Sequence, residues 1–61
     1  MTLELLKLWI KEQIAQHPEH KEEMLDLYSL CIDEIEAGES PANEINLCIN
    51  SIQELVEEKN D

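Results

Sequence analysis

The sequence predicts an all-α fold, a small three-helix bundle whose helices run up, down and up with short connections. The first observation is the inventory of one Trp, one Tyr, no Phe and a single Gly, which suits helices better than a sheet. The second is that proline and glycine interrupt the chain at only two places. The third is that apolar residues recur at helical spacing within each of the three segments. The 61 residues predict one domain with helices at about 3–16, 18–37 and 41–58.

The first helix is expected to begin after Thr2, a favourable N-cap residue whose hydroxyl can accept a hydrogen bond from the first turn. It is expected to end at His17, because the residue before a proline avoids the α-helical region. Pro18 fits the first position of the second helix, since the missing N–H has no helical partner there.

The second helix is expected to stop at Gly38, the residue that adopts a left-handed C-terminal conformation without a steric cost. Ser40 followed by Pro41 combines an N-cap residue with proline at the first helical position. This pair predicts the start of the third helix.

A helical wheel at about 100° per residue gives each helix one apolar face. The expected core consists of Leu3, Leu6, Ile10, Ile14, Met24, Leu25, Leu27, Tyr28, Cys31, Ile32, Ile35, Ile45, Cys48, Ile49, Ile52, Leu55 and Val56. Five large apolar residues fall outside these faces: Leu5, Leu8, Trp9, Leu30 and Leu47. In one interpretation the first helix lies deep between the other two, and Leu5 and Trp9 belong to the core. In the other, Leu5, Leu8 and Trp9 form a surface for a partner or for a homodimer, because tryptophan is enriched at binding hot spots.

The charge is strongly unbalanced, with fifteen acidic residues against four basic ones and a formal net charge of −11. This balance argues against direct nucleic-acid binding, because lysine and arginine must neutralise the phosphates. It also argues against an anionic membrane surface, where basic residues supply the attraction. A basic protein surface is the complementary partner.

Acidic residues concentrate on the second helix, where Glu19, Glu22, Asp26 and Asp33 are expected to share a face opposite the apolar residues. One interpretation is a solvated face that keeps the protein soluble. The other is a row of carboxylates that occupies the basic groove of a nucleic-acid-binding protein. The first interpretation is favoured, because polar helix faces are the rule. The imbalance of charge supports the second, because like charges at this spacing destabilise a helix by about 0.2–0.5 kcal/mol per pair, and a chain that tolerates this repulsion has a use for it.

No motif for catalysis, a cofactor or a metal stands out. His17 and His20 are three residues apart and Glu23 follows, but a specific metal site requires more ligand geometry than this spacing provides. Cys31 and Cys48 lie on apolar faces, where cysteine behaves as a small hydrophobic residue, although a redox pair between the two helices is the alternative. The absence of a signal-peptide pattern predicts a cytoplasmic protein with reduced thiols.

In size and charge the chain resembles the small acidic helical inhibitors that phages and mobile elements direct against host proteins, although it shares no motif with them. Together with the acidic second helix and the apolar patch around Trp9, this predicts a regulator or inhibitor that docks on a basic surface of a partner, with occlusion of a nucleic-acid-binding site as its specific form. The alternative is a structural homo-oligomer that associates through its first helix.

Overall fold

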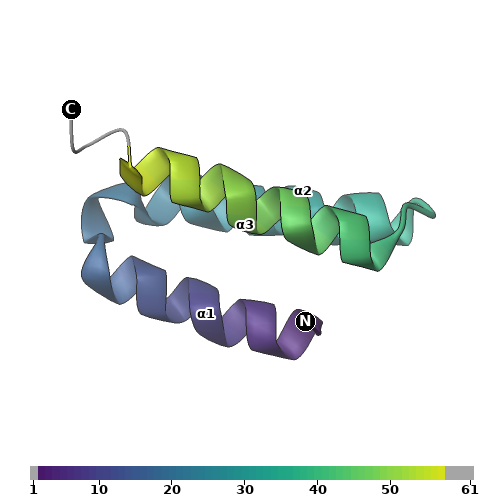
Figure 1. Cartoon of the computed structure of the whole chain (residues 1–61), viewed down its shortest axis with the longest axis horizontal. Helices are drawn as coiled ribbons and strands as arrows, with labels where there is room; N and C mark the ends of the chain where they lie inside the picture. Colours follow the sequence, from purple (N-terminus) through teal and green to yellow (C-terminus); the bar gives the residue numbers. More distant parts are fainter. Residues whose placement is uncertain (1, 58–61) are drawn as a thin grey trace.

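Three α-helices and one 3₁₀ turn make up the computed structural model of the chain, which describes residues 2–57. The elements are α1 (Leu3–Gln16), η1 (Pro18–His20), α2 (Lys21–Glu36) and α3 (Pro41–Glu57). Successive helices run in opposite directions, so the up-down-up bundle expected from the sequence is confirmed (Figure 1). Residue 58, where the third helix was expected to end, lies outside the described residues. Within residues 2–57, none of the helices is sufficiently long and apolar to cross a membrane.

Helix α1 begins as the sequence predicts, with Thr2 as its N-cap. The N–H of Leu5 donates a hydrogen bond to Thr2 Oγ1 at 3.3 Å, and the N–H of Leu6 donates to the Thr2 carbonyl at 2.9 Å. The hydroxyl therefore satisfies one of the N–H groups that a helix leaves unpaired in its first turn.

The connection between α1 and α2 differs from the expectation in one detail. Pro18 opens a 3₁₀ turn rather than an α-helical turn, and α2 starts only at Lys21. The backbone of His20, with φ −105° and ψ 14°, departs from helical values and separates the two elements. No side chain caps η1 at His17, so the first turn tightens into i→i+3 hydrogen bonding.

The connection between α2 and α3 closes with two hydrogen bonds around Gly38. The N–H of Gly38 donates to the Ile35 carbonyl at 3.1 Å, and the N–H of Glu39 donates to the Glu34 carbonyl at 3.0 Å. These bonds form a Schellman motif, which requires a positive φ at the glycine position. Gly38 has φ 109°, as the sequence predicts. Pro41 is then the first residue of α3.

Seven side chains of residues 2–57 are buried in the core, and all seven belong to the expected set: Leu6, Ile10, Met24, Cys31, Ile45, Cys48 and Ile52. Three of them are fully buried and come one from each helix, namely Leu6, Met24 and Ile52. Helices α2 and α3 pack closely together, whereas α1 contacts both of them more sparsely. The fold is thus a tight α2–α3 hairpin with α1 laid against one side (Figure 1).

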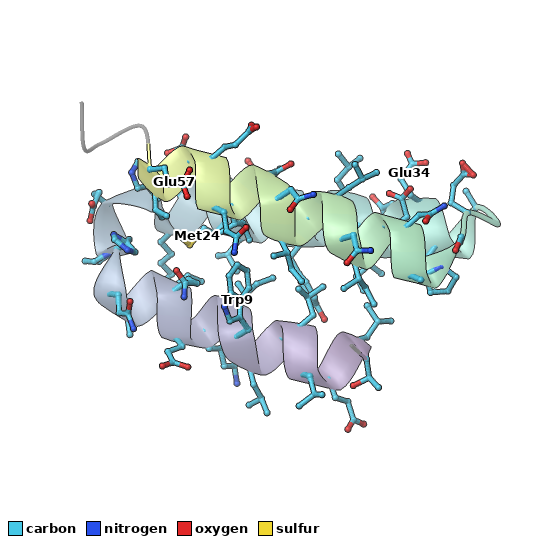
Figure 2. All side chains as sticks on the ribbon, in the orientation of Figure 1. Trp9, Met24, Glu34 and Glu57 are labelled. Carbon is cyan, nitrogen blue, oxygen red and sulfur yellow. The ribbon has the colours of Figure 1, made fainter. Side chains whose placement is uncertain are left out.

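Two residues of α1 and α2 correct the expected core. Leu25 was expected to be buried but is 42% exposed, because on a helical wheel it lies at the edge of the apolar face of α2. Trp9 was not on the expected apolar face but is half-buried and packs against the core. Figure 2 shows it on the side of α1 that faces the other two helices.

Ile52→Val removes one methylene from a fully buried side chain, and we expect it to lower the free energy of unfolding by about 0.5–1.5 kcal/mol. The matched control is Leu8→Ala, whose side chain is exposed and whose effect should stay within about 0.5 kcal/mol. Urea denaturation followed by circular dichroism measures both. Equal effects would contradict the assignment of the core.

Gly38→Ala is expected to destabilise the protein by about 1–2 kcal/mol, because alanine is strained at positive φ. A Cβ at this position would meet no atom within 4 Å, so the cost comes from the backbone alone. Glu39→Ala, at the neighbouring position without positive φ, is the control. The same urea titration checks the difference, and an unchanged midpoint for Gly38→Ala would rule out the strain.

Candidate functional site

The negative charge is unevenly distributed over the three helices. Helix α1 balances Glu4 and Glu12 against Lys7 and Lys11. Helix α2 carries six carboxylates against Lys21, and α3 carries three carboxylates and no basic residue between Pro41 and Glu57. The α2–α3 hairpin is therefore the acidic part of the molecule, and α1 is neutral.

The four acidic residues expected on one face are all exposed, but they do not form an unbroken row. Glu22, Asp26 and Asp33 lie on α2, whereas Glu19 lies on the preceding 3₁₀ turn. Glu22 and Asp26 are one turn apart, while about two turns separate Asp26 from Asp33. The exposed Leu30 lies between them, four residues after Asp26 and three before Asp33, which places it beside both on the helix surface. Carboxylates and an exposed leucine thus share one surface of α2.

Leu30 is joined by Leu47 of α3, and the two side chains are 56% and 57% exposed. Both line a hollow of about 240 Å³ between α2 and α3, together with Leu27, Cys31, Glu44, Cys48 and Ser51. Leu30 and Leu47, which both fall outside the expected core faces, are therefore brought together at this hollow by the fold. No residue of α1 contributes to this hollow.

A second hollow of about 380 Å³ continues the first along the hairpin. Its lining residues are Glu23, Asp26, Leu27, Ser51, Glu54 and Leu55. Because Leu27 and Ser51 line both, we treat the two hollows as a single feature, the outer groove. Its middle is apolar, three carboxylates lie at one end, and Glu44 lies at the other.

One of the carboxylates in the outer groove has a neighbouring histidine. Glu23 Oε1 lies 3.1 Å from His20 Nδ1, one turn earlier in the chain. The Glu23 side chain remains 58% exposed despite this contact, so it stays accessible to a partner.

The expected surface on α1 is only partly assembled. Leu5 and Leu8 are exposed, whereas Trp9 is half-buried against the core. The core interpretation therefore applies to Trp9, which contributes to packing. It does not apply to Leu5, which remains on the surface together with Leu8. The carboxylates of α2 and these leucines lie on different helices, and neither leucine lines the two hollows between α2 and α3.

Cys31 and Cys48 lie side by side beneath the outer groove, with their thiols hydrogen-bonded to each other. Both are buried and reduced. Burial raises the pKa of Cys31, and Glu44 raises it further, whereas the hydrogen bond from Cys48 lowers it. Burial also raises the pKa of Cys48, to about 11. Because the thiolate is the reactive form, these shifts favour the packing interpretation over a redox pair.

The histidines do not assemble a metal site with their neighbours. His17 caps α1, where its N–H donates to the Gln13 carbonyl at 2.8 Å, and its own carbonyl accepts the His20 N–H at 3.0 Å. Nδ1 of His20 faces Glu23, and its Nε2 is buried without a hydrogen-bond partner. Across residues 2–57, no three histidine, cysteine or acidic side chains are grouped to hold a metal ion.

The outer groove was the feature that sequence reasoning missed. Leu30 and Leu47 were recognised as apolar residues off their helical faces, but their meeting depends on the register of α2 against α3. The signal was present in the short connection after α2, because a tight antiparallel hairpin places residues at equal distances from the turn opposite one another. Leu30 lies eight residues before Gly38, and Leu47 lies nine residues after it.

The raised pKa of Cys48 predicts a fall in stability at alkaline pH. Between its ordinary value of 9.0 and about 11, the unfolded thiol loses its proton while the folded thiol keeps it. The free energy of unfolding should therefore decrease as pH rises, by about 1.4 kcal/mol per unit at most. Cys48→Ala should show a shallower decrease, whereas Leu8→Ala should keep the full one. Urea denaturation from pH 7.5 to 10.5 under reducing conditions makes the comparison, and equal slopes for both variants would contradict it.

Comparison with known proteins adds no assignment to this geometry. No protein-family model, no curated protein and no solved structure matches the chain.

Proposed function

We propose that this chain is a small protein-binding regulator or inhibitor that docks on a basic surface of a partner protein. The observation that carries the proposal is the concentration of charge on the α2–α3 hairpin next to exposed leucines. Complementary charge speeds and orients association, and desolvated apolar contacts supply much of the affinity. The hairpin offers both at one surface.

The form of inhibition that suits this charge is occlusion of a nucleic-acid-binding site. Such sites are basic because they must neutralise phosphates, so an acidic helix surface can compete for them. Glu22, Asp26 and Asp33 remain the residues proposed for this contact, with Glu19 at the start of the surface. The exposed Leu30 beside them supports a contact that combines charge with apolar burial rather than one that relies on charge alone.

The second candidate function is a structural homo-oligomer that associates through α1. Leu5 and Leu8 favour it, because they are exposed on the one helix whose charges balance. Self-association there avoids much of the repulsion that two acidic hairpins would experience. Sedimentation equilibrium at high micromolar concentration tests it: a dimer that Leu8→Asn dissociates would support it, and a monomer would dismiss it.

The regulator proposal predicts salt-sensitive capture of a basic protein from an extract of the native cells. Reversal of Asp26 and Asp33 to lysine should lower the captured amount at least about tenfold, as expected for charge pairs at a recognition surface. The same capture by wild-type protein should weaken as salt rises from about 0.05 to 0.5 M, where screening becomes strong.

The matched control reverses two exposed carboxylates of α1 instead, with Glu4→Lys and Glu12→Lys. Its net charge equals that of the hairpin variant, so any difference reports position rather than total charge. We expect it to retain most of the capture. Salt-independent capture, or an equal loss in the two variants, would overturn the proposal.

A further inference from the structure

We propose that the outer groove binds a basic amphipathic helix of about three turns, which a partner protein lays along the α2–α3 hairpin as a fourth helix. The inference rests on the proposed function and names the surface and the structural element that it uses. The length of the groove, its apolar middle and the position of its carboxylates all match such a helix.

The groove has the length of a short helix. On α3 its lining residues extend from Glu44 to Leu55, which are eleven residues apart. At a rise of 1.5 Å per residue this span is about 16 Å, the length of three helical turns. Two antiparallel helices form the two walls, so a third helix lying between them would contact both.

Apolar residues along the groove provide a floor for such a helix. Leu27 and Leu55 are half-buried and already contact the core, so their remaining surface faces the groove. Leu30 and Leu47 stand exposed on opposite walls. An occupant with apolar residues at i, i+3 or i+4, and i+7 would cover these leucines, as amphipathic helices do in other helix-binding grooves.

The carboxylates specify the charge of the occupant. Glu23, Asp26 and Glu54 lie at one end of the groove and Glu44 lies at the other. Among residues 2–57, the groove contains no lysine to balance them. A complementary helix therefore carries lysine or arginine at both ends of its apolar stripe, with more basic residues beside Glu23, Asp26 and Glu54.

The same charge argues against a second copy of the chain as the occupant. Two hairpins placed groove to groove would bring these carboxylates together, and like charges in contact suppress association. The α1 helix of a second copy also exposes leucines, but it is neutral and carries Glu4 and Glu12 as well as its lysines. A helix that is basic over its whole polar face fits the groove better.

The test uses the whole chain, labelled with ¹⁵N, and a synthetic helical peptide of about fifteen residues with a leucine stripe and lysines at both ends. A hydrocarbon staple on the polar face keeps so short a helix formed. One control peptide has the same composition in scrambled order, and a second has glutamate in place of each lysine. Fluorescence anisotropy gives the affinities, and amide chemical shifts locate the binding surface.

We expect the lysine peptide to bind and to shift the amides of Leu27, Leu30, Leu47 and Ser51. Both control peptides should bind at least about tenfold more weakly. The double variant Leu30→Asn and Leu47→Asn should weaken the lysine peptide by a similar factor, since truncation of central apolar contacts has effects of this size. Its matched control on α1, Leu5→Asn with Leu8→Asn, should change the affinity less than about twofold. All four leucines are exposed, so neither variant should disturb folding.

Several outcomes would overturn the inference: no binding of the lysine peptide at high micromolar concentration, equal binding of the scrambled peptide, shifts confined to α1, or dimerisation through Leu30 and Leu47. Its failure can be told apart from failure of the proposed function by the capture experiment. Salt-sensitive capture that survives Leu30→Asn with Leu47→Asn would leave the regulator proposal standing and remove the groove as its surface.

Discussion

The structure depends on one apolar cluster to which each helix contributes a fully buried side chain. Leu6, Met24 and Ile52 belong to the same apolar cluster, and no other large side chain in the described part of the chain is buried so completely. A domain of this size leaves a large share of its surface exposed, so each core residue accounts for much of its stability. The cluster must also hold together a chain of net charge −11, whose self-repulsion favours expansion.

The unequal packing of the helices determines which surfaces remain free. Because α1 covers only one side of the α2–α3 hairpin, the other side keeps a groove lined with partly buried and exposed leucines. In a four-helix bundle a further helix would fill this position. The groove is thus a direct result of building a bundle from three helices, and acidic residues lie at both of its ends.

The sequence predicted the fold well because its helix boundaries have local causes. Thr2, His17-Pro18, Gly38 and Pro41 each act on the backbone within one turn, and all four mark boundaries in the structure. The buried residues followed from helical periodicity for the same reason. Leu25 was the exception, because it lies at the edge of its apolar face, where burial depends on how neighbouring helices pack, and that is a long-range property.

The candidate site was harder to predict, since it depends on the relation between helices rather than on the pattern within one. The exposure of Glu22, Asp26 and Asp33 could be read from a single helical wheel. The pairing of Leu30 with Leu47 required the register of the hairpin, and the position of Trp9 required the tilt of α1 toward its neighbours. Neither quantity is encoded in the spacing of residues along one element.

The charge is balanced on α1, whereas carboxylates are in excess on the α2–α3 hairpin. This asymmetry affects how the molecule orients during association. It gives the molecule a permanent electric dipole moment directed across the bundle, with the negative pole on α2 and α3. In the field of a cationic macromolecule this moment exerts a torque, which acts over roughly a Debye length of about 10 Å. The chain therefore rotates during approach, and its negative pole is turned toward the cation before the two surfaces touch.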